Sequence, residues 1–246
     1  MNTYSQGSET VPVAGQAAEE VRPGGGGYFE ARPPGPAERP QSREEEWANA
    51  ATHGLGAALA LVAGLVMTQR AIPTGSLLKV LCAAIFSGAM FALYAISAIY
   101  HILRPGPAKD RFQRLDRAAI AVFVAGTYTP VALLMVRGTT GAALTVAEWV
   151  LAGVAILLLW GDPGRYARRS EWLYHIMGWI TILAARPFFR HTPPVVLAAL
   201  ALSGACYGAG VALLLRDRVK YLHAAFHVLT LVGAGLQFWA ISRFVN

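Results

Sequence analysis

Charged residues are scarce in this chain of 246 residues. Asp, Glu, Lys and Arg together make up 14% of it, whereas hydrophobic residues make up 55%. A soluble domain carries roughly a quarter charged residues. The shortage argues against an ordinary soluble enzyme, and the long apolar stretches indicate a polytopic membrane protein.

Cysteine is nearly absent as well. Cys82 and Cys206 lie far apart, each inside an apolar run, so we interpret them as small core residues rather than as a disulfide or a cysteine-type zinc site. No soluble segment interleaves aromatic and basic side chains, which argues against a nucleic-acid partner. No apolar core follows a basic start near Met1, so we expect no cleavable signal peptide.

The first 46 residues differ from the rest in charge and composition. They hold four Arg against eight Glu, a net charge of −4, which leaves +11 for residues 47–246. The stretch "VRPGGGGYFEARPPGPAERPQSR" is rich in Gly, Pro and Glu and cannot bury enough apolar surface to offset its ordering entropy. We therefore expect a disordered cytoplasmic tail, residues 1–44, followed by a membrane domain, residues 45–246.

Apolar runs of about the length that a bilayer requires, roughly 17–25 residues, fill the membrane domain. There are seven, at approximately residues 48–69, 77–102, 117–136, 141–160, 171–189, 194–215 and 222–244. The fifth is the least regular, because Arg186 and Pro187 cut it short. Pro130 should kink the third helix, and the pair Gly204 and Gly208 predicts a close helix contact. The sequence thus predicts an all-α fold, a bundle of seven transmembrane helices.

The positive-inside rule sets the orientation of these spans. With the N-terminus in the cytoplasm, the inside loops hold eleven Lys and Arg, against six in the outside loops and the C-terminus. We therefore expect a cytoplasmic N-terminus and an outside C-terminus, in the plasma or inner membrane, with the basic loops beside anionic lipid of the bilayer.

In that topology, polar side chains from four runs gather near the cytoplasmic boundary. They are Glu46, Asn49 and His53 in the first run, Ser97 and His101 at the end of the second, Asp116 before the third, and His223 and His227 in the last. Ionisable groups at membrane depth are costly, and this makes them functional candidates.

The spacing of the histidines fits a metal site. His223 and His227 are four residues apart and share one helix face, and His101 from another helix completes three imidazoles, a ligand set of catalytic zinc. Asp116 would hold or deprotonate water there, and Ser97, one turn below His101, would hydrogen-bond that water or a developing oxyanion. Histidines at a membrane interface that bind no metal also produce the His-x-x-x-His pattern.

The remaining polar residues in the apolar runs are assigned elsewhere. His175 fits a packing or interfacial role, and His191 falls on the outside face, away from the histidine group. Glu148 lies well inside the fourth run. It is either a protonated, hydrogen-bonded structural carboxyl or part of a polar path.

Five short motifs, "EWANAATH", "SAIYH", "LDRAAI", "GTYTP" and "HAAFH", occur in that order across residues 45–246. Together they resemble the haemolysin III branch of the progestin and adipoQ receptor family. The resemblance implies a seven-helix bundle with Zn²⁺ near the cytoplasmic side, and its three histidines fall on His101, His223 and His227. Its aspartate falls on Asp116 and its serine on Ser97.

The E-x-x-N-x-x-x-H pattern of this family falls on Glu46, Asn49 and His53, which we expect to support the metal ligands from behind. The resemblance further implies ceramidase-like hydrolysis of lipid amides, or a part in membrane lipid homeostasis. Our first hypothesis is a zinc-dependent hydrolase of an amide or ester bond in a membrane lipid, with Asp116 as general base. The alternatives are a zinc-stapled membrane sensor and a haemolysin-type lytic protein.

Overall fold

The structure is a computed structural model that describes residues 41–161, 173–174, 176–214, 216 and 219–246. Within these residues the chain is helical, with no strand, and six helical spans are long and apolar enough to cross a membrane. The helices involved are α1 (Arg43–Ala71), α2 (Leu77–Ile102), α3 (Pro107–Pro130), α4 (Gly138–Gly161), α7 (Pro194–Leu214) and α8 (Leu222–Val245). The predicted all-α, polytopic membrane architecture is confirmed.

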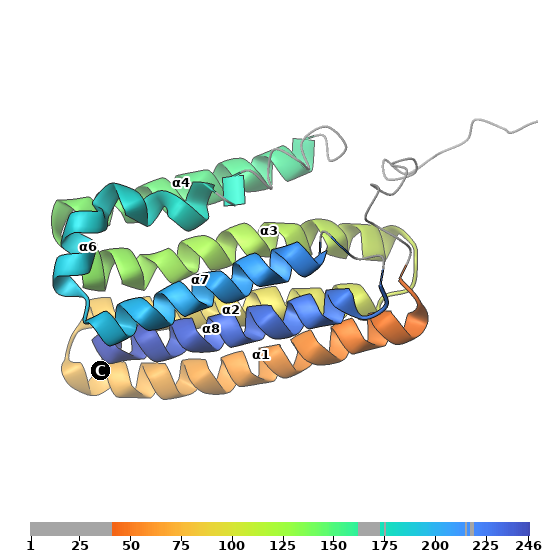
Figure 1. Cartoon of the computed structure of the whole chain (residues 1–246), viewed down its shortest axis with the longest axis horizontal. Coiled ribbons are helices and arrows are strands. Elements are labelled where there is room, and N and C mark those ends of the chain that lie inside the picture. The colour runs from red at the N-terminus through yellow and green to blue at the C-terminus, as the bar shows by residue number, and fades with distance from the viewer. Residues whose placement is uncertain (1–40, 162–172, 175, 215, 217–218) are drawn as a thin grey trace, which may run out of the picture.

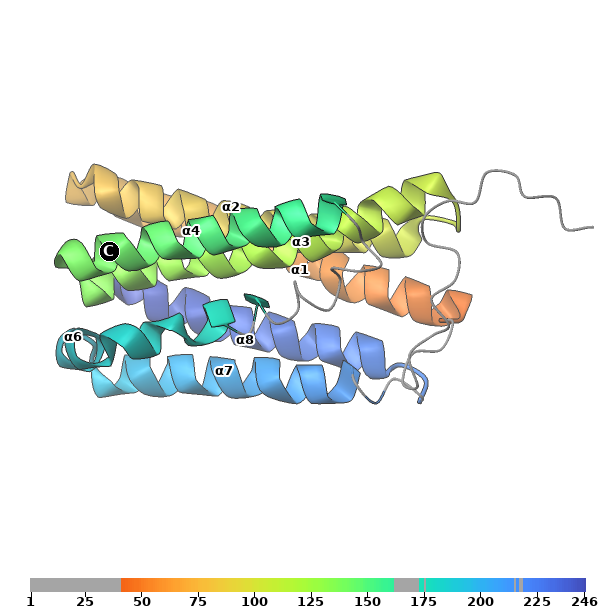
Figure 2. The ribbon, with the colours of Figure 1, turned by 90° about the horizontal axis from the view of Figure 1, so that it is seen from above.

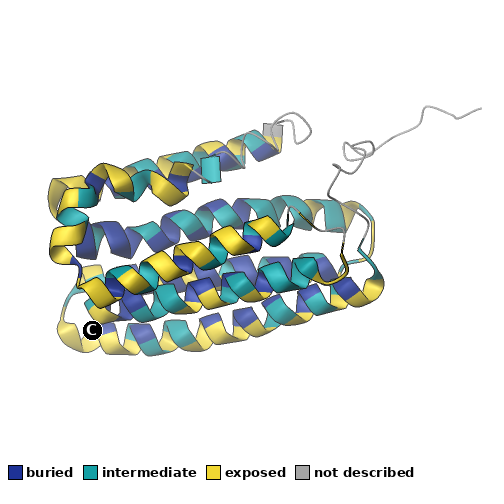
Figure 3. Ribbon diagram, in the orientation of Figure 1, coloured by how far each residue is buried: buried dark blue, intermediate teal, exposed yellow. Residues whose placement is uncertain are grey.

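The long helices run roughly along one common axis (Figures 1 and 2). Along the bundle, α2 packs against both α1 and α3, α8 packs against α1 and α7, and α4 covers α3. Large apolar side chains are exposed on the outward faces, where Figure 3 shows much of the exposed surface. In a membrane protein, an outward apolar surface of this kind faces the hydrocarbon core of the bilayer, which contains no water.

Local signals set where the helices begin. Ser42 and Glu45 form a reciprocal capping box at the start of α1, with Ser42 N donating to Glu45 Oε2 at 3.0 Å. Three consecutive glutamates in the first turn also match the positive end of the helix dipole. Gly106, with a φ of 149°, and Pro107 at the first helical position open α3.

Helix α3 therefore begins at Pro107, well before the predicted start of the third apolar run at residue 117. The intervening residues are basic and polar, and hydropathy assigned them to a loop although they form an α-helix. At its other end, α3 passes at Pro130 into a π-helix, η2 (Val131–Val136), rather than ending. Proline has no N–H to donate to the carbonyl four residues earlier. The backbone hydrogen bonds therefore change from the α-helical to the π-helical pattern at this point.

The fifth apolar run lies partly outside the described residues, as do His175 and most of the predicted tail. Its described part contains a 3₁₀-helix, η3 (Ile180–Ala184), and a short helix, α6 (Ala185–His191). In Figure 1, α4 ends at the end of the bundle where α1 and α8 begin, whereas α7 begins at the opposite end. The seventh span predicted here, and the orientation of the termini, stay predictions.

The predicted contact through Gly204 and Gly208 is wrong. Both glycines are exposed, and a Cβ added to either would meet nothing within 4 Å. Helix α7 instead approaches α8 through its other face, where Ser203 Oγ donates to the carbonyl of Gly233 at 2.9 Å. The small-residue spacing identified a face that could pack closely but not the face that meets a neighbour.

Both cysteines are free: Cys82 is buried and Cys206 is half-buried. Glu148 has no exposed surface, and neither of its carboxyl oxygens has a hydrogen-bond partner among the described residues. The neighbouring Trp149 donates to Thr129 Oγ1 at 3.1 Å and not to Glu148. The structure therefore gives no support to a hydrogen-bonded structural role for this carboxyl.

We expect the substitution Glu148→Met to stabilise the protein. A buried polar group without a partner costs about 1–3 kcal/mol, and Met removes that cost at similar volume. The midpoint of thermal unfolding in detergent should rise relative to wild type. A clear fall would show that Glu148 has a stabilising partner.

Candidate metal centre

Polar residues from four helices meet at one end of the bundle, the right-hand end in Figure 1. Helices α1, α3 and α8 begin there, and α2 ends there. Because the chain directions alternate, residues near the start of one helix lie beside residues near the end of the next. The predicted convergence of the polar residues on one boundary of the bundle follows from this arrangement.

Three histidines from two helices face one another at this end. One ring nitrogen from each of His101, His223 and His227 lies within 4.8 Å of the other two. The ring centroids are 5.2 Å apart for His101 and His223, 5.1 Å for His101 and His227, and 4.7 Å for His223 and His227. His101 and His227 are buried and His223 is partly buried. The three rings are thus close enough to bind one metal ion.

The second nitrogen of His101 is engaged by a carboxylate. His101 Nδ1 lies 2.6 Å from Glu46 Oε2. A carboxylate behind a ligating histidine fixes the ring orientation and the tautomer, and here it leaves Nε2 for a metal. Glu46 therefore contacts His101 directly, and its role in supporting a metal ligand stays a prediction.

The second nitrogen of His227 is also occupied. His227 Nδ1 lies 3.3 Å from the carbonyl oxygen of Asn49 and 3.2 Å from Thr52 Oγ1. The Thr52 hydroxyl donates to backbone carbonyls of its own helix, at 2.8 Å for Asn49. It can therefore only accept from His227, so Nδ1 carries the hydrogen and Nε2 keeps its lone pair. The residues present fit a metal held by imidazole nitrogens.

Thr52 was not identified from the sequence. A threonine near the start of an apolar helix is common, and its contact with His227 depends on how α1 is rotated against α8. Its spacing of three residues from Asn49 was the one available signal.

Lys109 contacts the same carboxylate that contacts His101. Its Nζ lies 2.7 Å from Glu46 Oε1 and 3.3 Å from the carbonyl oxygen of Leu103, and it sits over the ring of Tyr100 at 4.7 Å. A chain of contacts thus runs from Lys109 through Glu46 to His101. Hydropathy predicts Lys109 to be a basic residue of a loop, because it lies between two apolar runs and outside any predicted helix.

Glu45, the neighbour of Glu46, was also missed. It is fully buried, it caps its own helix, and its Oε1 accepts from the backbone N of Tyr221 at 2.9 Å. Tyr221 has a φ of 67°, a left-handed conformation that is uncommon for a residue with a side chain. Glu45 thereby holds the first turn of α1 against the start of α8, just before His223.

His53 lies behind the three histidines rather than among them. Its ring stacks on His227, with centroids 3.5 Å apart and planes at 14°, and it meets Tyr94 edge-on at 5.0 Å. Two buried atoms on this face of α1 have no hydrogen-bond partner among the described residues: His53 Nδ1 and Asn49 Oδ1. The predicted stripe of Glu46, Asn49 and His53 therefore contacts the histidine group at each of its positions.

Asp116 and Ser97 lie next to each other at the edge of this group. The Asp116 carboxyl lies close enough to Ser97, His101 and Arg117 to interact with each of them. Ser97 is buried and Asp116 is partly buried. Asp116 is not a member of the cluster formed by the three histidine nitrogens. It lies beside the candidate metal position rather than within the ligand set.

A model of the family described as haemolysin-III related matches residues 41–238. The chain belongs to the haemolysin-III-related family. It is 31% identical to a protein named Hemolysin-3 from Bacillus cereus, over 82% of this chain and 92% of that protein. It is 32% identical to a Hemolysin-3 homolog from Bacillus subtilis strain 168, over 80% of this chain and 93% of that protein.

The resemblance drawn from the five motifs is thereby confirmed, and the family falls within the superfamily that includes the progestin and adipoQ receptors. As a haemolysin-III-related protein with six candidate spans in its described residues, the chain is a multi-pass integral membrane protein of the cell membrane. The names of the two relatives describe those proteins and assign no lytic activity to this one.

We expect substitutions behind His101 to weaken metal binding. Glu46→Gln removes the charge that orients the ring and should lower zinc affinity about 10- to 100-fold, whereas Lys109→Met, one contact further away, should cost less. Competition with a chromophoric chelator measures both. Lys79→Met is the matched control, because Lys79 contacts the carbonyl of Asn246 at the other end of the bundle. Zinc affinity equal to wild type in Glu46→Gln would contradict the role of this carboxylate.

Proposed function

We propose that this protein binds Zn²⁺ through His101, His223 and His227 and hydrolyses an amide or ester bond of a membrane lipid. The observation that supports it most directly is the histidine group itself. Three imidazole nitrogens lie within 4.8 Å of one another. Two of the rings also have their second nitrogen engaged by acceptors from α1.

The donor set favours zinc over harder cations. Imidazole suits zinc and other transition metals, whereas magnesium and calcium take oxygen ligands. Three histidines with an open fourth position are a ligand set of catalytic rather than structural zinc. When bound there, zinc supplies a Lewis acid and generates a nucleophile from water at neutral pH.

Asp116 is the candidate general base. Its carboxyl lies beside His101 but outside the ligand set, where it can accept a proton from the attacking water. The hydroxyl of Ser97 lies beside this carboxyl, and by donating to it would fix its direction. Ser97 is in that case a positioning residue for Asp116, a role that differs from the contact with the water or the oxyanion expected from the sequence.

A lipid substrate follows from where the histidine group lies. It is built from the ends of spanning helices whose outward faces are apolar, so it lies within reach of the lipids of the bilayer. If the N-terminus is cytoplasmic, as the charge distribution predicts, the group lies near the cytoplasmic boundary. Residues 45–246 then form one membrane domain and residues 1–44 its cytoplasmic tail.

A zinc-stapled sensor is the second candidate. The histidine group joins the end of α2 to the start of α8, so a metal there would hold two helices together without any reaction. The position of Asp116 outside the ligand set favours the hydrolase, because a structural zinc site closes its shell with a fourth protein ligand.

We expect purified protein to contain one zinc ion per chain, and His227→Ala to lose it. Elemental analysis after gel filtration measures the zinc content. His191→Ala is the control, because His191 is exposed at the end of α6, away from the histidine group. Unchanged zinc content in His227→Ala would place the metal elsewhere.

Asp116→Ala should retain zinc and lose at least about 100-fold in the turnover of a lipid amide or ester, the scale of general-base catalysis. Mass spectrometry of the released fatty acid measures turnover. Asp110→Ala, in the first turn of the same helix, should behave like wild type. Full zinc occupancy with no cleavage of lipid amides or esters by the wild-type protein would support the sensor instead.

A further inference from the structure

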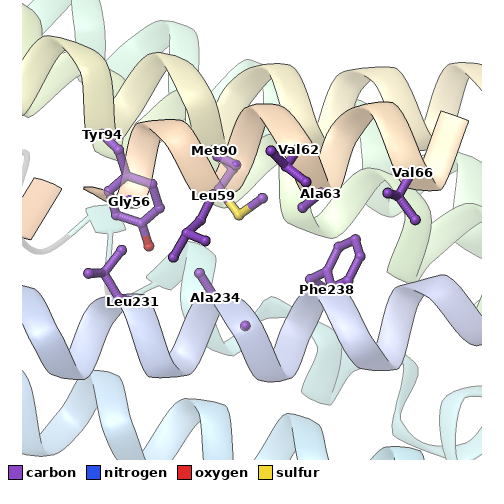
Figure 4. Close-up of a pocket in the computed structure, with 12 residues that line it drawn as sticks. Gly56, Leu59, Val62, Ala63, Val66, Met90, Tyr94, Leu231, Ala234 and Phe238 are labelled. Atoms are coloured by element: carbon purple, nitrogen blue, oxygen red, sulfur yellow. The ribbon is translucent and has the colours of Figure 1, made fainter. Parts of the chain in front are cut away.

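A groove of about 390 Å³ runs along the bundle between α1 and α8. Figure 4 shows Gly56 and Tyr94 at one end of it and Val66 and Phe238 at the other. Small residues open it, among them Ala60 on α1 and Gly235 on α8, and its lining is almost entirely apolar. Both helices span the membrane, so the groove borders the hydrocarbon region of the bilayer.

The length of the groove matches one leaflet. From Gly56 to Val66 the helix rises about 1.5 Å per residue, so the α1 wall is ~15 Å long. The hydrocarbon core of a bilayer is ~30 Å thick, which gives each leaflet ~15 Å. An acyl chain of a membrane lipid has this reach, and a groove aligned with the helix axes is aligned with such chains.

One end of the groove lies beside the histidine group. Tyr94, which lines the groove, contacts the ring of His53, and that ring stacks on the candidate ligand His227. His53 is only 5% exposed, and its Nδ1 has no hydrogen-bond partner among the described residues. His53 does not itself line the groove, so Tyr94 is the residue that connects the groove to the histidine group.

We infer that one acyl chain of a membrane lipid binds in the groove between α1 and α8, entering sideways from the leaflet, with its polar linkage towards His53. The inference rests on the proposed function for the reaction, but binding of the chain does not require turnover. It assigns the groove as the site that selects the lipid and presents its linkage to the histidine group.

A second hollow provides a matched comparison. It lies between α1 and α2, has a volume of about 240 Å³, and is lined by Gly64, Gly88 and Phe91 among others. It is also apolar and borders the bilayer, but Tyr94, the link to the histidine group, does not line it. A chain bound merely because a surface is apolar would occupy both hollows.

Gly235→Phe should block the groove, and Gly88→Phe should block only the second hollow. Both glycines are exposed, and a Cβ added to either meets nothing within 4 Å, so both substitutions are accommodated at the surface. Replacing glycine inside a helix is also favourable for helix formation. Thermal unfolding checks that each variant folds, and Gly235→Leu is a smaller obstruction for the same purpose.

The probe is a phosphatidylcholine with a photoactivatable diazirine on one acyl chain, mixed into nanodiscs that contain the full chain. Met90 is the diagnostic residue, because it lines the groove but is only 4% exposed, so lipid outside the groove cannot reach it. We expect photolabelling of Met90 with the diazirine in the middle of the acyl chain, and of Phe238 with the diazirine at the chain end.

Gly235→Phe should reduce labelling of Met90 by about tenfold or more, since it displaces several buried methylene groups, whereas Gly88→Phe should leave it unchanged. No labelling of Met90 in wild type, or equal labelling in both variants, would overturn the inference. Zinc content and lipid turnover are measured on the same samples. Labelling that responds to Gly235→Phe without any lipid turnover would support acyl-chain binding in the groove and refute the proposed hydrolysis. Lipid turnover that Gly235→Phe leaves unchanged would support hydrolysis and refute a role of the groove in it.

Discussion

The carboxylate of Glu46 joins three helices at the end of the bundle where the histidines meet. Glu46 lies in the first turn of α1, and its carboxylate contacts His101 on α2 at 2.6 Å and Lys109 on α3 at 2.7 Å. Hydrogen bonds with a charged partner are shorter and stronger than neutral ones, so these contacts restrict both the helices and the His101 ring. The proposed metal chemistry depends on this arrangement, because a ligand set assembled from separate helices is only as well defined as their relative positions.

The histidine group was predictable because two simple rules determine it. Helical periodicity places His223 and His227 on one face, and alternating chain direction brings the end of α2 beside the start of α8. Neither rule depends on side-chain packing. The same rules brought Glu46, Asn49 and His53 to this end, although they did not show that His53 stacks on His227 instead of joining the ligands.

Other features were beyond the sequence because they depend on how helices are rotated against one another. The acceptor role of Thr52 and the contact between Glu45 and Tyr221 are of this kind. Lys109 was overlooked for a different reason: hydropathy detects the part of a helix inside lipid and not its polar extension. The pair Gly204 and Gly208 gave an incorrect contact, since small residues permit close packing on any face that lacks a neighbour, including a face towards lipid.

The start of α1 has a mechanical consequence for the whole site. Ser42 closes the capping box, and within two helical turns of it the chain supplies Glu45 to α8, Glu46 to His101 and Asn49 to His227. An α-helix is stiff over such a distance. A displacement of the chain at Gln41 would therefore move Glu45, Glu46 and Asn49 together. Residues 41–49 thus connect the chain that precedes them directly to the residues that hold the imidazoles in place.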